Sequence, residues 1–231
     1  MLEYAMNYLS QNPLLHMGMI VPIKRGTAHI LYADEGGVCL IDKNSGAYMM
    51  SVSSYETGIR LLNLLPDEGL FSFHQAFMLD SFKAKMRYTT LLTNYQAVYF
   101  SNDFLSVDSC LVINPFKSSD FETVIHNYDI EAGADYLLKR IEEGELFGGY
   151  VNTTLIGFAG IHAEGSIGML KVFPQYRRKG YGTALTCFLV NHQLSQGIMP
   201  FEQIGVTNDS SLKLAVKLGF TISAGYVYWM F

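Results

Sequence analysis

The chain has few charged residues for its length. Charged side chains make up 16% of its 231 residues, whereas hydrophobic residues make up 49%. This balance excludes an intrinsically disordered chain, because there is enough apolar surface to bury a core. The formal net charge is -5, which argues against a duplex nucleic-acid binder, since such proteins need a basic face to neutralise phosphates. We therefore expect a globular protein with no nucleic-acid partner.

Cysteines and long hydrophobic runs are also scarce. The three cysteines, at 39, 110 and 187, form no closely spaced pair, which argues against a disulfide framework or a structural zinc site. We expect them to be reduced and packed as small hydrophobic residues, and we expect no metal. No window approaches the ~20 apolar residues of a membrane span, and no basic segment followed by an apolar run opens the chain. The expectation is a cytoplasmic protein with no membrane partner.

The first half of the chain has an irregular α+β pattern. A weak helical periodicity runs over residues 2–17, in which Pro13 either interrupts the helix or starts a second turn. Polar turn clusters separate short apolar runs that are typical of hairpins. The pattern predicts strands at 28–32, 37–41, 47–52, 70–73, 89–92 and 97–100, and helices at 54–65 and 76–86.

The second half repeats this alternation more clearly. The pattern predicts strands at 121–126, 145–149, 154–161, 166–173, 201–206, 220–223 and 226–230, and helices at 131–143, 180–194 and 210–218. The fold class we predict is therefore α+β, with a mixed sheet. We place a domain boundary between residues 119 and 120, which gives an N-terminal domain over 1–119 and a C-terminal domain over 120–231.

The two halves resemble each other in the order of their elements. Residues 49–52 precede a helix as residues 169–172 do, and the Val98-Tyr99-Phe100 segment ends the first half as Val227-Tyr228-Trp229 ends the second. A degenerate internal duplication explains this order. The alternative is that any two α+β halves share some strand–helix alternation, and the sequence leaves both open. Residues 53–58 of the first half are neutral to acidic, so we expect no phosphate site there.

The turn at residues 172–185 carries the strongest chemical signal. An apolar strand ends at Phe173, and Pro174 stops its hydrogen-bond ladder. Three consecutive cations and two closely spaced glycines then open an apolar helix: Arg177, Arg178, Lys179, Gly180 and Gly182. A helix N-terminus offers free N–H donors and positive potential, and glycines allow an anion to approach them. The turn therefore predicts a phosphate or pyrophosphate site.

Several common phosphate-binding motifs do not match this turn. It lacks the Gly-Lys-Ser/Thr of a nucleotide-triphosphatase loop. It also lacks the three-glycine dinucleotide fingerprint with its downstream acid. The remaining alternative is a strand–loop–helix turn with exposed cations and no ligand.

The turn resembles the Arg/Gln-x-x-Gly-x-Gly/Ala signature of the GNAT superfamily of N-acetyltransferases, with Arg177, Gly180 and Gly182 in its defining places. Residues 208–220 resemble a second signature of that family, Asn-x-x-Ser-x-x-Leu-Tyr-x-Lys-x-Gly-Phe, in which Asn208 and Ser211 match. The two signatures occur in the expected order and spacing. The tail is most similar to the branch related to glycine N-acyltransferases. The resemblance covers about half of the chain and implies a GNAT fold over 120–231, preceded by a degenerate GNAT-like half.

The resemblance also implies a cofactor and a partner. The co-substrate would be acetyl-coenzyme A, and the acceptor a primary amine on a small molecule or peptide. The strand through Leu170, Lys171 and Val172 would splay from residues 201–206 and pair with the pantetheine amides. Backbone N–H groups of the turn would hold the pyrophosphate, and Asn208 and Ser211 would lie near the thioester or the pantetheine arm. The pyrophosphate residues implied in this way are Arg177, Arg178, Lys179, Gly180, Tyr181, Gly182 and Thr183.

The groups that move protons are less clear. The family often uses a tyrosine acid in its second signature, where this chain has Ala215. Tyr228 is our candidate for the acid, with Tyr181 and Tyr226 as alternatives, although each could equally serve in packing. Glu164 is our candidate for the base, against the alternative of a solvated glutamate in a turn. The neighbouring His162 is a weaker candidate.

These observations favour an N-acyltransferase. The alternative is a catalytically weak acyl-coenzyme A sensor or interaction module, which the missing acid at position 215 would favour. A third option, a purely structural role, requires the basic turn to be an accident. The resemblance further implies that the first half shapes the acceptor pocket or forms the face of a homodimer.

Overall fold

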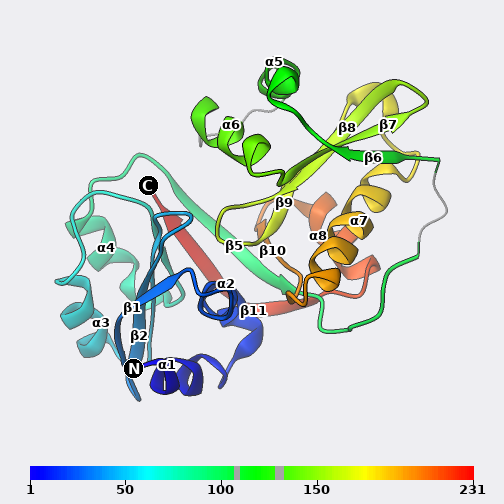
Figure 1. Cartoon of the computed structure of the whole chain (residues 1–231). Helices are drawn as coiled ribbons and strands as arrows, with labels where there is room; N and C mark the ends of the chain where they lie inside the picture. The colour runs from blue at the N-terminus through cyan, green and yellow to red at the C-terminus, as the bar shows by residue number, and fades with distance from the viewer. Residues whose placement is uncertain (107–109, 128–132) are drawn as a thin grey trace. The chain divides into compact units, whose positions relative to one another are not determined.

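The computed structural model describes residues 1–106, 110–127 and 133–231. The chain divides into two compact units (Figure 1). The first unit comprises Met1–Val98 together with Phe201–Phe231, and the second comprises Tyr99–Pro200. The compact units divide the chain after residues 98 and 200. The sequence-based domain boundary between residues 119 and 120 stays a prediction.

The first unit combines helices from both ends of the chain with seven strands. Its strands are β1 (Ala28–Asp34), β2 (Gly37–Asp42), β3 (Tyr48–Val52), β4 (Phe71–Phe73), β5 (Leu91–Val98), β10 (Phe201–Gly205) and β11 (Thr221–Met230). Its helices are α1 (Leu2–Leu9), α2 (Pro13–Arg25), α3 (Tyr55–Leu62), the short 3-10 helix η1 (Ala76–Met78), α4 (Leu79–Lys85) and α8 (Asp209–Lys217).

The strand order in this unit is β1-β2-β3-β4-β11-β5-β10. The pairs β1–β2 and β2–β3 are antiparallel, and the crossover through α3 makes β3 and β4 parallel. β11, the last strand of the chain, lies between β4 and β5 and pairs antiparallel with both. β5 in turn pairs with β10. Strands from the two ends of the sequence therefore build one sheet, which is why residues 201–231 belong to the first unit.

Aromatic residues dominate the core of the first unit. The rings of Phe73 and Phe82 stack with centroids 3.9 Å apart, and the ring of Tyr228 stacks with that of Phe73 at 5.2 Å. Phe71, Phe73 and Phe82 are almost fully buried. Burial of each such side chain contributes about 1.5–3 kcal/mol, so β4, α4 and β11 are held together mainly by this cluster.

Among its described residues, the second unit has four strands and three principal helices. Its strands β6 (Val112–Pro115), β7 (Leu146–Val151), β8 (Thr154–Ile161) and β9 (Ile167–Val172) form an antiparallel series in the order β9-β8-β7-β6. Its helices are α5 (Phe121–Ile125), α6 (Ala134–Glu142) and α7 (Tyr181–Ser195), with short 3-10 helices η2 (Ser118–Asp120) and η3 (Pro174–Tyr176).

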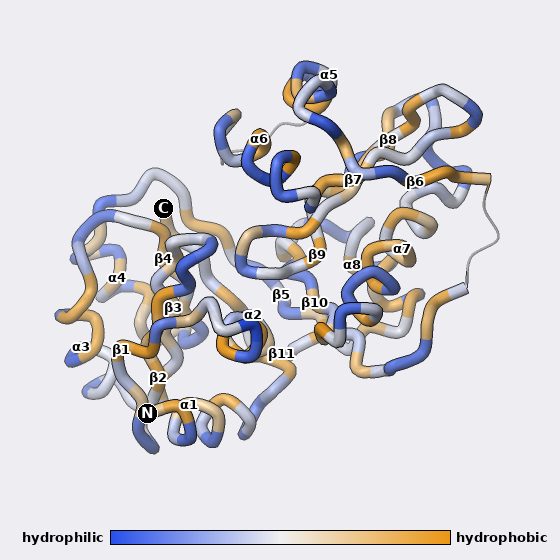
Figure 2. The backbone as a smooth tube through the Cα atoms, viewed as in Figure 1, coloured by the Kyte–Doolittle hydropathy of each residue, from blue (hydrophilic) through white to orange (hydrophobic). Residues whose placement is uncertain are grey.

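Helix α7 packs on β8 and β9. Figure 2 shows the hydrophobic colour that runs along this helix, and its buried residues include Leu185, Leu189 and Val190. A separate apolar cluster joins α5 and α6 to the sheet through Val124, Leu137 and Phe158. The second unit therefore has its own apolar core, formed partly by α7 and partly by α5 and α6.

The order of helices and strands repeats along the chain. If the 3-10 helices and the intervening strand β6 are set aside, the series α1, α2, β1, β2, β3, α3, β4, α4, β5 is matched by α5, α6, β7, β8, β9, α7, β10, α8, β11. Nine elements in the same order are hard to explain as common strand–helix alternation, and they strengthen the duplication hypothesis. The α+β fold class is confirmed.

Three local predictions were wrong. Residues 121–126 form helix α5 rather than a strand, because Phe121, Val124 and Ile125 have helical spacing and Val124 packs against α6. The two strands expected within 89–100 are one strand, β5, and the closing pair within 220–230 is also one strand, β11, with an irregularity between Ile222 and Tyr226.

Other elements differ only at their ends. The weak periodicity over 2–17 is two helices, and Pro13 is the first residue of the second. The side chain of Asn12 accepts a hydrogen bond from the backbone N–H of Leu15, which caps that helix. The helix expected at 131–143 is observed from Ala134, and its first two predicted residues lie outside the described residues. Strand β6 was not predicted. No helix among the described residues has the length and apolar character needed to cross a membrane.

Candidate functional site

The turn between β9 and α7 leaves a row of backbone donors open. Arg178 and Gly180 adopt left-handed conformations, with φ of 66° and 82°, and Gly180 is the N-cap of α7 without a side-chain cap. The first N–H of this region with a helical acceptor is that of Ala184, which bonds the carbonyl of Gly180 at 3.1 Å. Within the described part of the chain, no acceptor bonds the backbone N–H groups of residues 178–183. These donors are available to an anion.

The charge around the turn has one sign. Residues 165–201 contain no Asp or Glu, although the chain as a whole is acidic. Arg177, Arg178 and Lys179 are exposed. The Nε of Arg177 donates to the carbonyl of Val172 at 3.0 Å, which ties the turn to the end of β9. The Nζ of Lys179 lies 5.9 Å from the ring centre of Tyr176. The open donors and these cations together suit a pyrophosphate.

Tyr181, the first residue of α7, lies next to the thiol of Cys110. Burial raises the pKa of Tyr181, and the nearby Cys110 thiol, which hydrogen-bonds the tyrosine hydroxyl, adds to the increase. Tyr181 is therefore a neutral phenol near pH 7. It can donate a hydrogen bond to a phosphate but carries no negative charge that would repel one.

Strand β9 contains a bulge just before the turn. Phe158 of β8 pairs with Lys171, and Gly160 pairs with Gly168, so β9 has one more residue than β8 in this interval. Met169 has φ of 50° in the same interval. A bulge bends a strand and re-aims its polar groups. The half-buried residues Leu170, Lys171 and Val172 follow it directly, so the segment predicted to pair with pantetheine is an irregular one that leads into the anion site.

Asn208 and Ser211 lie in the first unit, at the start of α8. The Asn208 side chain accepts hydrogen bonds from the Ser211 N–H at 3.1 Å and the Ser210 hydroxyl at 2.9 Å, so it caps the helix. At the other end, Gly219 has φ of 87° and Phe220 is buried. Much of the second signature therefore begins and ends a helix. A direct role of Asn208 or Ser211 with the cofactor stays a prediction.

The candidate acid and base lie in different units. Glu164 is 8% exposed, and its carboxylate accepts a hydrogen bond from the Ser166 hydroxyl. It is therefore a buried, partnered carboxylate rather than a solvated one. Tyr228 is 5% exposed within the aromatic core of the first unit, and burial raises its pKa. Its stacking on Phe73 favours a packing role, and the catalytic roles of both residues stay predictions.

His162 has a more defined environment than its sequence position indicated. Its Nδ1 lies 2.8 Å from the Tyr136 hydroxyl, which also accepts the N–H of Ala163 at 3.2 Å. Burial lowers the pKa of His162, against the opposing effect of the nearby Glu164 charge. A side chain at Gly168 would lie 2.5 Å from the imidazole Nε2, so this glycine is needed for the ring to occupy its place.

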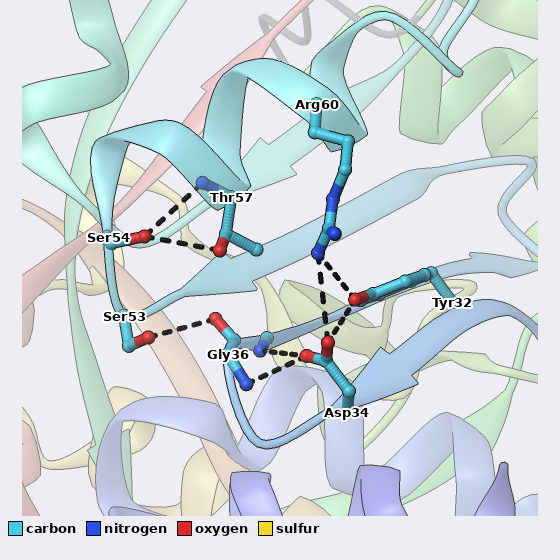
Figure 3. A network of polar contacts seen from close by, with 8 residues as sticks. Tyr32, Asp34, Gly36, Ser53, Ser54, Thr57 and Arg60 are labelled. Carbon is cyan, nitrogen blue, oxygen red and sulfur yellow. Dashed lines mark hydrogen bonds and ion pairs between the residues drawn. The ribbon is translucent and has the colours of Figure 1, made fainter.

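The corresponding turn of the first unit, between β3 and α3, is closed (Figure 3). The Ser54 hydroxyl accepts the Thr57 N–H at 3.2 Å, and Ser53 bonds the carbonyl of Gly36 through both its N–H and its hydroxyl. The Asp34 carboxylate accepts the N–H groups of Gly36 and Gly37 and the hydroxyl of Tyr32. Arg60, a cation on α3, already contacts the Asp34 carboxylate and the Tyr32 hydroxyl. The lack of a phosphate site at residues 53–58 stays a prediction, and the Thr57 N–H of this turn already has an acceptor.

The sequence analysis overlooked one ionisable residue, Glu202 on β10. Its side chain is half-buried, and desolvation raises its pKa to about 8. The only sequence signal was a glutamate within a predicted strand, and this signal does not identify the neighbouring strands.

Similarity to known proteins supports the fold. Residues 153–230 match the family model described as FR47-like protein. No curated protein sequence matches the chain. A Drosophila protein solved by a structural genomics consortium has a TM-score of 0.72 at 14% identity, covering 99% of this chain and 94% of that chain.

Two further solved structures carry family names. A GCN5-related N-acetyltransferase from Kribbella flavida has a TM-score of 0.56 at 10% identity, covering 94% of this chain and 95% of its own. A GNAT-family acetyltransferase from Colwellia psychrerythraea has a TM-score of 0.53 at 15% identity, covering 98% and 97%. The chain therefore has the GNAT fold over nearly its whole length.

Proposed function

We propose that this protein is an acyl-coenzyme A-dependent N-acyltransferase that transfers an acetyl group to a primary amine on a small molecule or peptide. The observation that carries the proposal is the open β9–α7 turn, with unbonded N–H groups at residues 178–183 beside three exposed cations. The GNAT fold supports the same activity.

The residues present fit a coenzyme A pyrophosphate. The backbone N–H groups of Arg178, Gly180 and Thr183 would donate hydrogen bonds to its oxygens, and the cations would balance its charge. The bulged segment of β9 that precedes the turn offers backbone groups to the pantetheine arm. Bound acetyl-coenzyme A would supply an activated acyl group as its thioester.

A thiol-release assay tests this proposal. Acetyl-coenzyme A is incubated with a panel of primary amines, and free thiol is measured with time. We expect amine-dependent thiol release. Tight coenzyme A binding without turnover of any amine would sink the proposal.

Ala215 motivates one second candidate, an acyl-coenzyme A sensor or interaction module. Ala215 is fully buried on α8 and occupies the position where the family signature has tyrosine. In a sensor, acetyl-coenzyme A would change the affinity for a partner without being consumed. Intact acetyl-coenzyme A after prolonged incubation with amines, together with such a change in affinity, would favour this second candidate.

A further inference from the structure

The turn between β8 and β9, residues 162–166, is polar and yet largely buried. Glu164 and Ser166 are 8% and 2% exposed, and the carboxylate of the first accepts a hydrogen bond from the hydroxyl of the second. The N–H of His162 bonds the carbonyl of Ser166 at 2.8 Å, and the N–H of Gly165 bonds the carbonyl of His162 at 2.9 Å. Buried polar groups need such partners, so this turn has one defined conformation.

Helices α6 and α7 each contact this turn through a polar side chain, and all of these groups belong to the second unit. The Tyr136 hydroxyl of α6 lies 2.8 Å from the His162 Nδ1 and accepts the N–H of Ala163 at 3.2 Å. From α7, the Gln193 Nε2 donates to the carbonyl of Gly165 at 2.7 Å. Strand β9 runs from this turn to the open anion turn before α7. Contacts that fix residues 162–166 therefore also fix the start of the strand that leads to the anion site.

The imidazole of His162 fills the space beside the bulge of β9. A Cβ at Gly168 would lie 2.5 Å from the His162 Nε2, and the three atoms nearest to that Cβ all belong to this ring. Met169, the next residue, has φ of 50° inside the strand. A residue other than glycine adopts this conformation only where its surroundings impose it. The ring is part of those surroundings, because it packs directly against the preceding residue.

The contact between His162 and Tyr136 favours a neutral imidazole. The hydroxyl accepts the N–H of Ala163 and has one proton, which it can donate to Nδ1 only when Nδ1 carries none. Protonation of Nδ1 would bring two N–H donors to the same hydroxyl and remove Nδ1 as the acceptor of its proton. The ring is half-buried, so a charged imidazole can turn toward solvent, where water hydrates it.

The surroundings of the ring also favour the neutral form. Arg140 of α6 is 3% exposed, its guanidinium lies 6.0 Å from the ring centre of Tyr136, and it pairs with Glu143 of the same helix. Desolvation is the main cause that lowers the pKa of His162, the Arg140 charge adds to this effect, and the Glu164 charge opposes it. The contacts of the turn with β9 and α7, a glycine and a glutamine, do not titrate.

We propose that His162 is a positioning residue for coenzyme A binding: with Tyr136 it clamps the start of β9 while its imidazole is neutral, and protonation opens this clamp and weakens binding. This inference rests on the proposed acyl-coenzyme A-dependent function. It gives His162 a role other than that of a general base. The clamped state disfavours the proton, whereas the open state takes it up near the ordinary pKa of about 6.5. Affinity is therefore lost as pH falls below about 6.5.

The test measures the Kd of coenzyme A for the full chain by isothermal titration calorimetry at about pH 7.5 and about pH 5.5. The variant His162→Asn places an amide oxygen near the position of Nδ1 and cannot titrate. It should bind within about threefold of the wild type near pH 7.5. Between the two pH values, the wild-type affinity should fall about tenfold more than that of the variant, because uptake of one proton changes affinity by at most about tenfold per pH unit.

Two further variants make the comparison specific. The phosphates of coenzyme A ionise near pH 6, and this contribution is common to all of the proteins. His126→Gln removes an exposed imidazole from α5 of the same unit and should keep the wild-type pH dependence. Tyr136→Phe removes the hydroxyl and should weaken binding about fivefold near pH 7.5. A wild-type pH dependence in His162→Asn would overturn the inference, as would wild-type affinity in Tyr136→Phe.

Hydrogen exchange separates this inference from the proposed function. If the wild type binds no coenzyme A at either pH, the proposed function fails, and the clamp is judged on the protein alone. Amide exchange of residues 166–172, corrected for the intrinsic effect of pH, should become about tenfold faster on acidification in the wild type and in His126→Gln. It should not do so in His162→Asn. The same change in all three proteins, or no change in the wild type, would overturn the inference.

Discussion

The β3–α3 turn of the first unit and the β9–α7 turn of the second occupy corresponding places in the repeated order of elements, yet they treat their backbone donors differently. At the N-cap, α3 has Ser54, whose hydroxyl satisfies the Thr57 N–H, whereas α7 has Gly180 and no side-chain cap. Two residues later, α3 has Glu56 and α7 has Gly182. The first turn supplies the Ser54 hydroxyl oxygen to its helix N-terminus. The second leaves those donors open and surrounds them with cations.

This difference separates stability from binding. Helix N-termini need acceptors, and side-chain caps contribute about 0.5–2 kcal/mol. The first unit uses these contributions for its own stability. The second forgoes them, because an anion can satisfy the donors only when no side chain already does. Exchanging residues between the two turns should therefore change binding and stability in opposite directions.

The largest expected effect comes from Gly182→Glu, which gives α7 the acid that α3 has at the same helical position. A carboxylate about 4 Å from the pyrophosphate should cost about 4 kcal/mol at an effective dielectric constant of about 20, or roughly 1000-fold in coenzyme A affinity. The same acid favours the helix N-terminus by about 0.3–1 kcal/mol. Isothermal titration calorimetry should show lost binding, while the melting temperature holds or rises.

The reciprocal variant Glu56→Gly is the control for this experiment. It removes an acid from α3 and should leave coenzyme A affinity unchanged, because the closed turn contributes no ligand. Wild-type affinity in Gly182→Glu would show that the β9–α7 turn does not hold the cofactor.

A smaller effect is expected from the double variant Arg178→Gln, Lys179→Gln. Both cations are exposed, so each contributes less than a buried pair would, and we expect coenzyme A to bind about 10–100-fold more weakly. The salt dependence of binding should also become shallower, since fewer charges are involved. The control Lys24→Gln, Lys43→Gln removes the same charge from exposed positions of the first unit. Equal losses in both double variants would mean that net charge, rather than this turn, attracts the cofactor.

Local signals explain why the second turn could be predicted from the sequence. Pro174 ends the strand, and the cations and glycines that indicate the turn follow it within a few residues. The placement of Tyr228 could not be predicted, because it depends on β11 lying between β4 and β5, far away in the sequence. The place of Glu202 opposite Ala97 depends on the pairing of β10 with β5 in the same way. The strand expected at 121–126 failed for a different reason, since Phe121 and Val124, three residues apart, pack as one helical face in the apolar cluster that includes α6.

The first unit also contains a buried pair of histidines, His16 and His74, which should make this unit sensitive to acid. The His74 Nδ1 bonds the Met50 carbonyl at 3.1 Å, and desolvation, with the nearby His16, lowers the pKa of His74 to about 3. Because the folded pKa lies below the unfolded value of 6.5, the unfolded state takes up the proton first. Stability is therefore lost as pH falls below about 6.5, by about 2 kcal/mol near pH 5.

Urea unfolding near pH 7 and near pH 5 tests this sensitivity. The variant His74→Gln keeps a hydrogen-bond donor but cannot titrate, so it should lose about 2 kcal/mol less on acidification than the wild type. His16, whose pKa burial also lowers, remains in both proteins and accounts for a residual slope. An identical pH dependence in the wild type and the variant would exclude His74 as the source.

The smallest expected effect is that of Ser54→Ala, which opens a donor in the closed turn without adding cations. Loss of the cap should lower the free energy of unfolding by about 1 kcal/mol, measured by urea titration, because the Thr57 N–H loses its acceptor. Coenzyme A affinity should not change, and no second binding event should appear. The remaining carboxylates, Asp34 and Glu56, still repel an anion there. A new coenzyme A site in this variant would mean that open donors alone create anion binding, and that the cations of the second turn are dispensable.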